Sequence, residues 1–114
     1  MRMLLPLLAG CGPMNVRVDF TVQNDASYDF DATEACVSLD TIDDIICSPA
    51  FEVQSGQSET VYLEFAEYPG ARTAAYVNAL DFEGDVYETA IQPLDVVGSE
   101  LFTTIVVTDA DCCF

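Results

Sequence analysis

The sequence contains no histidine and no tryptophan, and because its three basic residues are all arginine, it contains no lysine either. Histidine and lysine are common bases in catalysis, so a serine or cysteine nucleophile would lack its usual neighbour. No glycine-rich phosphate loop leads into a helix, and nucleotide binding therefore has no support. Without tryptophan, a sugar-binding cleft also lacks its usual platform. These absences argue against the common enzyme classes.

Basic residues are also scarce relative to acidic ones. Twenty aspartates and glutamates oppose the three arginines, which gives a formal net charge of −17. Such a field repels nucleic acid and anionic lipid headgroups and excludes both as partners, whereas it attracts a basic partner or one bridged by cations. A halophilic source explains this excess as well as an acid-rich exported protein does. The apolar content of 51% favours a folded chain over a disordered one.

The first eleven residues follow the pattern of an export signal. Arg2 supplies the positive charge, a short leucine-rich run supplies the apolar middle, and the run ends in Leu8-Ala9-Gly10-Cys11. This motif resembles the lipobox of bacterial lipoproteins. The resemblance implies that residues 1–10 are a signal peptide and that Cys11 is the lipid attachment site. Two acyl chains suffice for stable anchoring. The alternative is a hydrophobic N-terminal strand with a chance cysteine.

The resemblance also implies a location. The protein is expected to be exported and anchored by its lipid to the cell envelope, at the outer membrane or the periplasmic face if the source is Gram-negative. Gly12 stands where an aspartate tends to retain such proteins in the inner membrane, so the outer membrane is mildly favoured. Residues 11–15 then form the lipidated N-terminus and a short tether.

From residue 16 onward, apolar and polar residues alternate with a period of two, and no stretch of ten or more residues has a helical period. About 100 residues are enough for one domain. The pattern predicts an all-β fold over residues 16–114, an antiparallel β-sandwich of about seven strands. The predicted strands are 16–23, 35–39, 45–53, 60–65, 73–80, 85–92 and 101–108, with a loop over 24–31.

Several strands carry a recognisable pattern. They are Val-x-Phe-x-Val-x-Asn at 18–24, Gly-Gln-Ser-x-Thr-Val-x-Leu-x-Phe at 56–65 and the turn Asp-x-x-Gly-Asp at 81–85. Together they resemble bacterial immunoglobulin-like adhesion and accessory modules. This resemblance implies an immunoglobulin-like sandwich and does not imply a particular activity.

Four cysteines follow Cys11, and an even number in an exported chain indicates disulfides. Cys36 and Cys47 are symmetric about a turn centred between residues 41 and 42, so they can face each other on paired strands. Cys112 and Cys113 either staple the last strand to an earlier one, which is the favoured reading, or bond to each other. A zinc site is the rival reading, but histidine is absent and adjacent cysteines are poorly spaced ligands.

Calcium is the best chemical use of the acidic residues, because hard cations take several oxygen ligands. The first candidate is the turn containing Asp81, Glu83 and Asp85, with Glu88 as a further ligand. Weaker candidates are Asp29, Asp31 and Glu34, and then Asp43 and Asp44. None has the spacing of an EF-hand loop. A solvated acidic turn is the structural alternative for each.

These observations predict a non-catalytic binding or structural module, tethered at the envelope through Cys11. Its partners are expected to be the membrane, through the lipid, and another envelope protein or a polysaccharide. The alternative is a calcium-dependent adhesion or binding module that uses the acidic loops. A small hydrolase with two catalytic carboxylates is a distant third. No catalytic residue is singled out.

Overall fold

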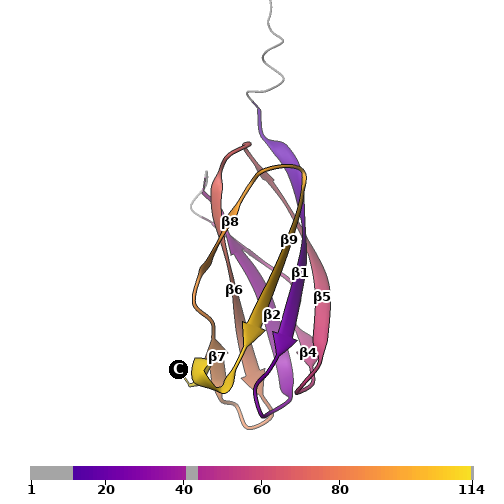
Figure 1. Ribbon diagram of the computed structural model, residues 1–114, viewed down its shortest axis with the longest axis vertical. Helices are drawn as coiled ribbons and strands as arrows, with labels where there is room; N and C mark the ends of the chain where they lie inside the picture. Colours follow the sequence, from indigo (N-terminus) through magenta and orange to yellow (C-terminus); the bar gives the residue numbers. More distant parts are fainter. Residues whose placement is uncertain (1–11, 41–43, 114) are drawn as a thin grey trace, which may run out of the picture.

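The computed structural model describes residues 12–40 and 44–113, and these residues form nine β-strands and one 3-10 helix (Figure 1). In chain order they are β1 (Met14–Asn24), β2 (Phe30–Ser38), β3 (Ile45–Cys47), β4 (Phe51–Val53), β5 (Ser58–Glu67), β6 (Arg72–Asp81), β7 (Val86–Glu88), β8 (Gln92–Asp95), β9 (Glu100–Val107) and η2 (Asp109–Asp111). The predicted all-β class is confirmed.

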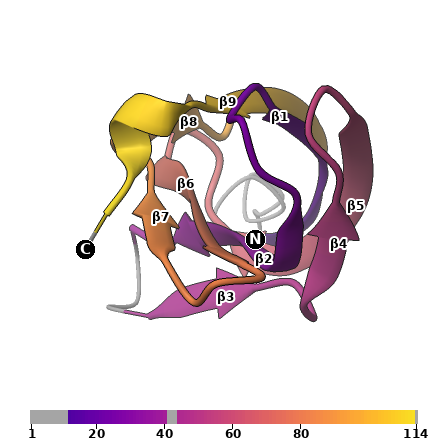
Figure 2. The same ribbon diagram turned by 90° about the horizontal axis from the view of Figure 1, so that it is seen from below.

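The strands form two sheets that face each other as a sandwich (Figure 2). The smaller sheet has the order β5-β1-β9. In the larger sheet β2 and β6 lie side by side, β3 and β4 pair with β2, and β7 and β8 pair with β6. All these pairings are antiparallel except that between β1 and β9, which is parallel. The predicted sandwich is therefore confirmed.

Alternation along the strands determines which side chains reach the interior, because successive residues of a strand point to opposite faces. In β1, Val16, Val18 and Phe20 are at most 1% exposed, whereas Arg17 is exposed. The core lies between the sheets and joins these residues to the inward side chains of the other strands. Each sheet thus presents one polar face to solvent.

Two predicted strands are interrupted, which turns the expected seven into nine. The segment 45–53 divides into β3 and β4 on either side of Pro49, whose nitrogen has no hydrogen to donate to a neighbouring strand. The segment 85–92 likewise divides into β7 and β8. β1 begins at Met14, two residues before the predicted domain. β2 begins at Phe30, inside the predicted loop, because the Phe30 side chain is buried in the core.

The sandwich has two distinct ends (Figure 1). β1 enters at one end, a few residues after the predicted lipid site. The loop 25–29, the turn 81–85 and η2 with the following cysteines lie at the other end. No helix in residues 12–40 and 44–113 is long and apolar enough to cross a membrane.

Candidate functional site

The predicted pairing of Cys36 with Cys47 is confirmed by a disulfide between β2 and β3. The two residues are direct partners in the antiparallel register, and their Cα atoms are 4.1 Å apart. This is close to the short spacing of a pair without mutual backbone hydrogen bonds. The turn that joins the two strands falls on residues 41–43, which lie outside the described residues.

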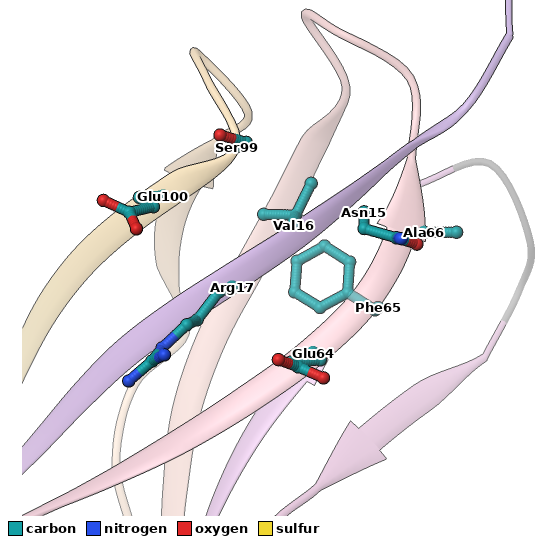
Figure 3. A pocket seen from close by; sticks show the side chains of 8 residues that line it. All are labelled: Asn15, Val16, Arg17, Glu64, Phe65, Ala66, Ser99 and Glu100. Atoms are coloured by element: carbon teal, nitrogen blue, oxygen red, sulfur yellow. The ribbon is translucent and has the colours of Figure 1, made fainter.

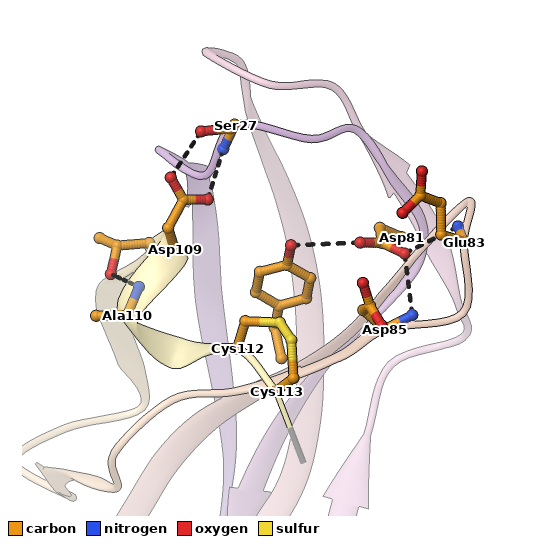
Figure 4. The surroundings of a disulfide bond; sticks show 10 residues. Ser27, Asp81, Glu83, Asp85, Asp109, Ala110, Cys112 and Cys113 are labelled. Carbon is orange, nitrogen blue, oxygen red and sulfur yellow. Dashed lines mark hydrogen bonds between the residues drawn. A yellow bond between two sulfur atoms is a disulfide. The ribbon is translucent and has the colours of Figure 1, made fainter.

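The turn 81–85 was the first candidate for calcium, but its central carboxylate is already engaged (Figure 4). Asp81 is 5% exposed. Its Oδ1 accepts hydrogen bonds from the backbone N–H groups of Glu83 and Asp85, at 2.9 and 3.0 Å. The Tyr87 hydroxyl donates to its Oδ2 at 3.3 Å. Asp81 therefore holds the turn in shape, and Gly84 completes it with a positive φ of 87°.

The structure does not gather the predicted calcium ligands into one cluster. In the described part of the chain, the side chains of Asp81, Glu83 and Asp85 do not converge as a group of potential metal ligands. Asp29 accepts a hydrogen bond from the Ser55 backbone N–H at 2.8 Å. Calcium binding stays a prediction without geometric support. The remaining candidates are placed as follows: Asp31 and Glu34 are exposed on β2, Asp44 accepts from the Ile45 N–H, and Asp43 lies outside the described residues.

The buried turn shifts the pKa of the tyrosine beneath it. Burial raises the pKa of Tyr87 to about 12, and the charge and hydrogen bond of Asp81 add to the effect. Both causes favour the neutral phenol over the phenolate. Tyr87 therefore remains a hydrogen-bond donor to Asp81 at neutral pH.

Cys112 and Cys113 form a disulfide with each other, directly after η2 (Figure 4). The favoured expectation, a staple from this segment to an earlier strand, is not what the structure contains. A backbone bridge between Cys112 and Tyr87 of β7 makes that connection instead. Ser27 adds a second connection, because its N–H and hydroxyl donate to Asp109 at 2.8 and 2.6 Å. These bonds lower the pKa of Asp109.

A row of three charged residues crosses the outer face of the smaller sheet (Figure 3). Arg17 of β1 lies in register between Glu64 of β5 and Glu100 of β9. The Arg17 Nε is 3.3 Å from an Asp19 carboxylate oxygen, and its Cζ is 4.2 Å from the centre of the Tyr62 ring. We call Glu64, Arg17 and Glu100 the Arg17 row. Its two carboxylates have a positive charge between them.

A matching row crosses the outer face of the larger sheet, but its central residue is neutral. Asn78 of β6 lies in register between Glu34 of β2 and Glu88 of β7. We call these three residues the Asn78 row. The row crosses a hollow of about 530 Å³, which is lined chiefly by Ala32, Glu34, Ala50, Asn78, Leu80, Val86 and Glu88. The hollow therefore combines an apolar floor with two carboxylates.

No positive charge of the described residues lies close to the Asn78 row. Arg72 is on the same outer face of β6, but six residues away, or about 20 Å along a strand. That distance is about two Debye lengths at physiological ionic strength, so its charge is largely screened. Arg17 belongs to the opposite sheet. The two glutamates thus stand uncompensated.

Tyr76, two residues before Asn78, is sensitive to both carboxylates. Burial raises the pKa of Tyr76, and the negative charges of Glu88 and Glu34 raise it further. Cys36 pairs with Tyr76 in the register of β2 and β6, so the Cys36–Cys47 disulfide lies beside the hollow. The acidic hollow is therefore attached to a braced part of the sheet.

Sequence reasoning considered Glu34 and Glu88 only as members of separate calcium clusters, and it missed Asn78 and Leu80. The alternation of β2 and β6 was visible in the sequence, and it places these residues on one face of each strand. The pairing register that sets Glu34 and Glu88 on either side of Asn78 was not visible. A correct register of β2, β6 and β7 was the missing signal.

A comparison with protein-family models and a comparison with curated proteins found no match for this chain. The functional argument therefore depends on the residues described above.

Proposed function

We propose that this protein is a lipid-anchored, non-catalytic binding module of the cell envelope, and that the Asn78 row binds cationic side chains of a partner protein. The observation that carries the proposal is a pair of glutamates on an apolar hollow with a neutral residue between them. The same arrangement on the other sheet has an arginine at its centre.

A lysine or arginine side chain matches the chemistry of the hollow. Its methylene stem can lie along the apolar floor at Leu80 and Val86, and its charged head can sit between Glu34 and Glu88. Neighbouring strands are about 4.8 Å apart, so the two glutamates start about 10 Å apart at the backbone. That gap is wide enough for one cationic head, and Asn78 can still offer it an amide oxygen.

The expected affinity of a single contact is modest. An exposed ion pair contributes about 0.2–1 kcal/mol, and salt weakens it. A partner therefore needs several cationic residues, and the strongly acidic surface of the whole chain would speed its approach. Such binding suits a module that is held close to its partner by an anchor.

The anchor is the second part of the proposal. If Cys11 is the lipidated N-terminus, only Gly12 and Pro13 separate it from β1. This tether is shorter than the predicted one, because β1 already begins at Met14. The β1 entry end of the sandwich would then lie near the membrane, with the turn 81–85 and the two adjacent cysteines farthest from it.

The binding claim is tested by removing carboxylates from one face at a time. In a background of Cys11→Ser, we expect the double variant Glu34→Gln/Glu88→Gln to weaken binding of a short oligolysine peptide by up to about tenfold. The matched control is Glu64→Gln/Glu100→Gln, which changes the net charge equally on the other sheet. Titration calorimetry at low salt measures both. Equal losses in the two variants would contradict the proposed site and indicate attraction by net charge alone.

The anchor claim is tested separately in a bacterial host that processes lipoproteins. Wild-type protein should incorporate an alkyne-labelled fatty acid and remain in the membrane fraction, whereas Cys11→Ser should do neither. Cys112→Ser/Cys113→Ser is the control and should be labelled like wild type. An unlabelled wild-type protein that retains Met1 would refute lipidation at Cys11.

A further inference from the structure

The C-terminal segment brings two sulfur atoms next to a carboxylate. A carboxylate oxygen of Asp85 and the Sγ atoms of Cys112 and Cys113 all lie within 4.8 Å of one another. Within residues 12–40 and 44–113, no other group of three or more possible metal-ligating side chains is this close. Figure 4 shows the three residues on neighbouring segments at the end of the sandwich. In the disulfide form both sulfurs are bonded to each other.

The backbone that carries the cysteines is held by contacts other than their disulfide. Cys112 bridges to Tyr87, and its side chain packs against the core. The preceding η2 is closed by a capping box, in which Thr108 accepts from the Ala110 N–H and donates its own N–H to Asp111 at 2.9 Å. The segment should therefore keep its place when the disulfide opens.

Asp85 is held from the opposite side. Its backbone N–H donates to Asp81 at 3.0 Å, which fixes the turn, while its own side chain is exposed. The hydrogen bonds printed on the Asp81 carboxylate come from Glu83, Asp85 and Tyr87 and leave the Asp85 carboxylate to face the sulfurs. Two independently supported segments thus meet at one point.

We propose that reduction of the Cys112–Cys113 disulfide by a thiol converts this cluster into a binding site for a thiophilic divalent cation such as Zn²⁺. Two reducing thiols give up two electrons and two protons and become a disulfide, while the protein S–S bond breaks to give two thiols. The cation then displaces both thiol protons. It is bound by the two thiolates and the Asp85 carboxylate, and a water completes the coordination.

The donor set and its spacing fit such an ion. Tetrahedral Zn²⁺ with Zn–S bonds of about 2.3 Å sets its ligand atoms about 3.7 Å apart, and the three atoms here already lie within 4.8 Å. Thiolates favour Zn²⁺ and similar ions over calcium. The surrounding acidic residues, among them Glu83 and Asp111, add an attractive field for a cation. Oxidation removes the thiolates, so the site exists in one redox state only.

The test uses Cd²⁺ as a spectroscopic probe, because cadmium–thiolate bonds absorb in the ultraviolet. The full chain with Cys11→Ser is titrated with Cd²⁺ before and after reduction by a phosphine, and Zn²⁺ is then added as a competitor. We expect one equivalent of Cd²⁺ to bind the reduced protein and none of this absorption in the oxidised protein. Asp85→Asn should weaken binding about tenfold or more, since even groups outside the first coordination shell contribute that much.

The control is Cys112→Ser/Cys113→Ser, which keeps the Cys36–Cys47 pair and reports any binding by those thiols after reduction. The proposal is overturned if this variant retains the absorption, or if Asp85→Asn binds Cd²⁺ as tightly as wild type. It is also overturned if the reduced wild-type protein shows no absorption. Far-ultraviolet circular dichroism is recorded throughout, and loss of the sheet signal on reduction would likewise overturn it, because the site depends on the fold.

Discussion

The Arg17 row and the Asn78 row are the same arrangement with one difference. Each has a glutamate on either side of a central residue across three neighbouring strands, on the outer face of one sheet. Arginine occupies the centre of one row and asparagine the centre of the other. The first face provides its own positive charge, whereas the second leaves two carboxylates for a partner to neutralise. A single side chain decides which face of this acidic sandwich is suited to binding.

The rows also differ in what supports them. The Cys36–Cys47 disulfide lies in the larger sheet and joins two of its strands beside the Asn78 row. In the described residues the smaller sheet contains no disulfide. Bracing of a polar face is expected where that face must keep its shape for a partner.

The largest effect is expected from removing this brace. Cys36→Ala/Cys47→Ala should lower the free energy of unfolding by about 3 kcal/mol, because the disulfide closes a loop of 11 residues in the unfolded chain. Chemical denaturation measures the change. Cys112→Ser/Cys113→Ser is the control and should cost far less, since its disulfide closes almost no loop. Similar losses in the two variants would show that chain entropy is not the cause.

The next effect exchanges the centres of the two rows. Asn78→Arg should weaken oligolysine binding by about tenfold or more, because the new guanidinium occupies the position intended for the partner's cation and repels it. Arg17→Asn should strengthen binding, since it leaves a second uncompensated pair of glutamates. Calorimetry on both variants at equal ionic strength provides the comparison. If both variants changed affinity by the same small amount, the rows would not be distinct sites.

A smaller effect concerns the titration of Tyr76. Glu34→Gln/Glu88→Gln should lower the pKa of Tyr76, because the charges of Glu88 and Glu34 hold it up, and burial should still keep it above 10.0. The raised pKa favours the neutral phenol, so its contribution to stability is complete below pH 10 and is lost as the pH rises through the folded-state pKa. Carbon-13 NMR of the tyrosine rings follows the titration. Glu64→Gln/Glu100→Gln should leave the Tyr76 pKa unchanged, and a shift in that control would contradict the assignment.

The smallest effect is on stability at low salt. Two like charges about 10 Å apart in water repel by about 0.4 kcal/mol before screening. Glu34→Gln/Glu88→Gln should therefore stabilise the fold by a few tenths of a kcal/mol, while Glu64→Gln/Glu100→Gln should give no gain because it removes neighbours of Arg17. Thermal melts detect the difference, which should vanish in about 1 M salt, where the Debye length is about 3 Å. A difference that persisted in high salt would have another origin.

Local patterns in the sequence were sufficient for much of the fold. The alternation from Val16 onward predicted β1, and the symmetric spacing of Cys36 and Cys47 predicted their disulfide. Both features depend on residues that are neighbours in the chain or separated by one turn. The breaks at Pro49 and after Glu88 changed the number of strands and left the architecture as predicted.

The candidate site could not be predicted in the same way. Glu34 and Asn78 are far apart in the chain, and a slip of one residue in the register would turn the side chains of one strand to the other face. Asp81 was assigned to calcium because its neighbours are acidic, but the fold buries it and satisfies it with backbone donors. Proximity in sequence showed which residues are acidic, and only the pairing of strands showed which of them remain available.

The most direct test of the binding claim is a two-dimensional amide NMR titration of the Cys11→Ser protein with oligolysine. The account predicts that the largest shifts fall on residues around the Asn78 row, such as Ala32, Asn78 and Val86, and that they disappear in Asn78→Arg. Shifts centred on the Arg17 row or the turn 81–85, or shifts spread evenly over both sheets, would contradict it.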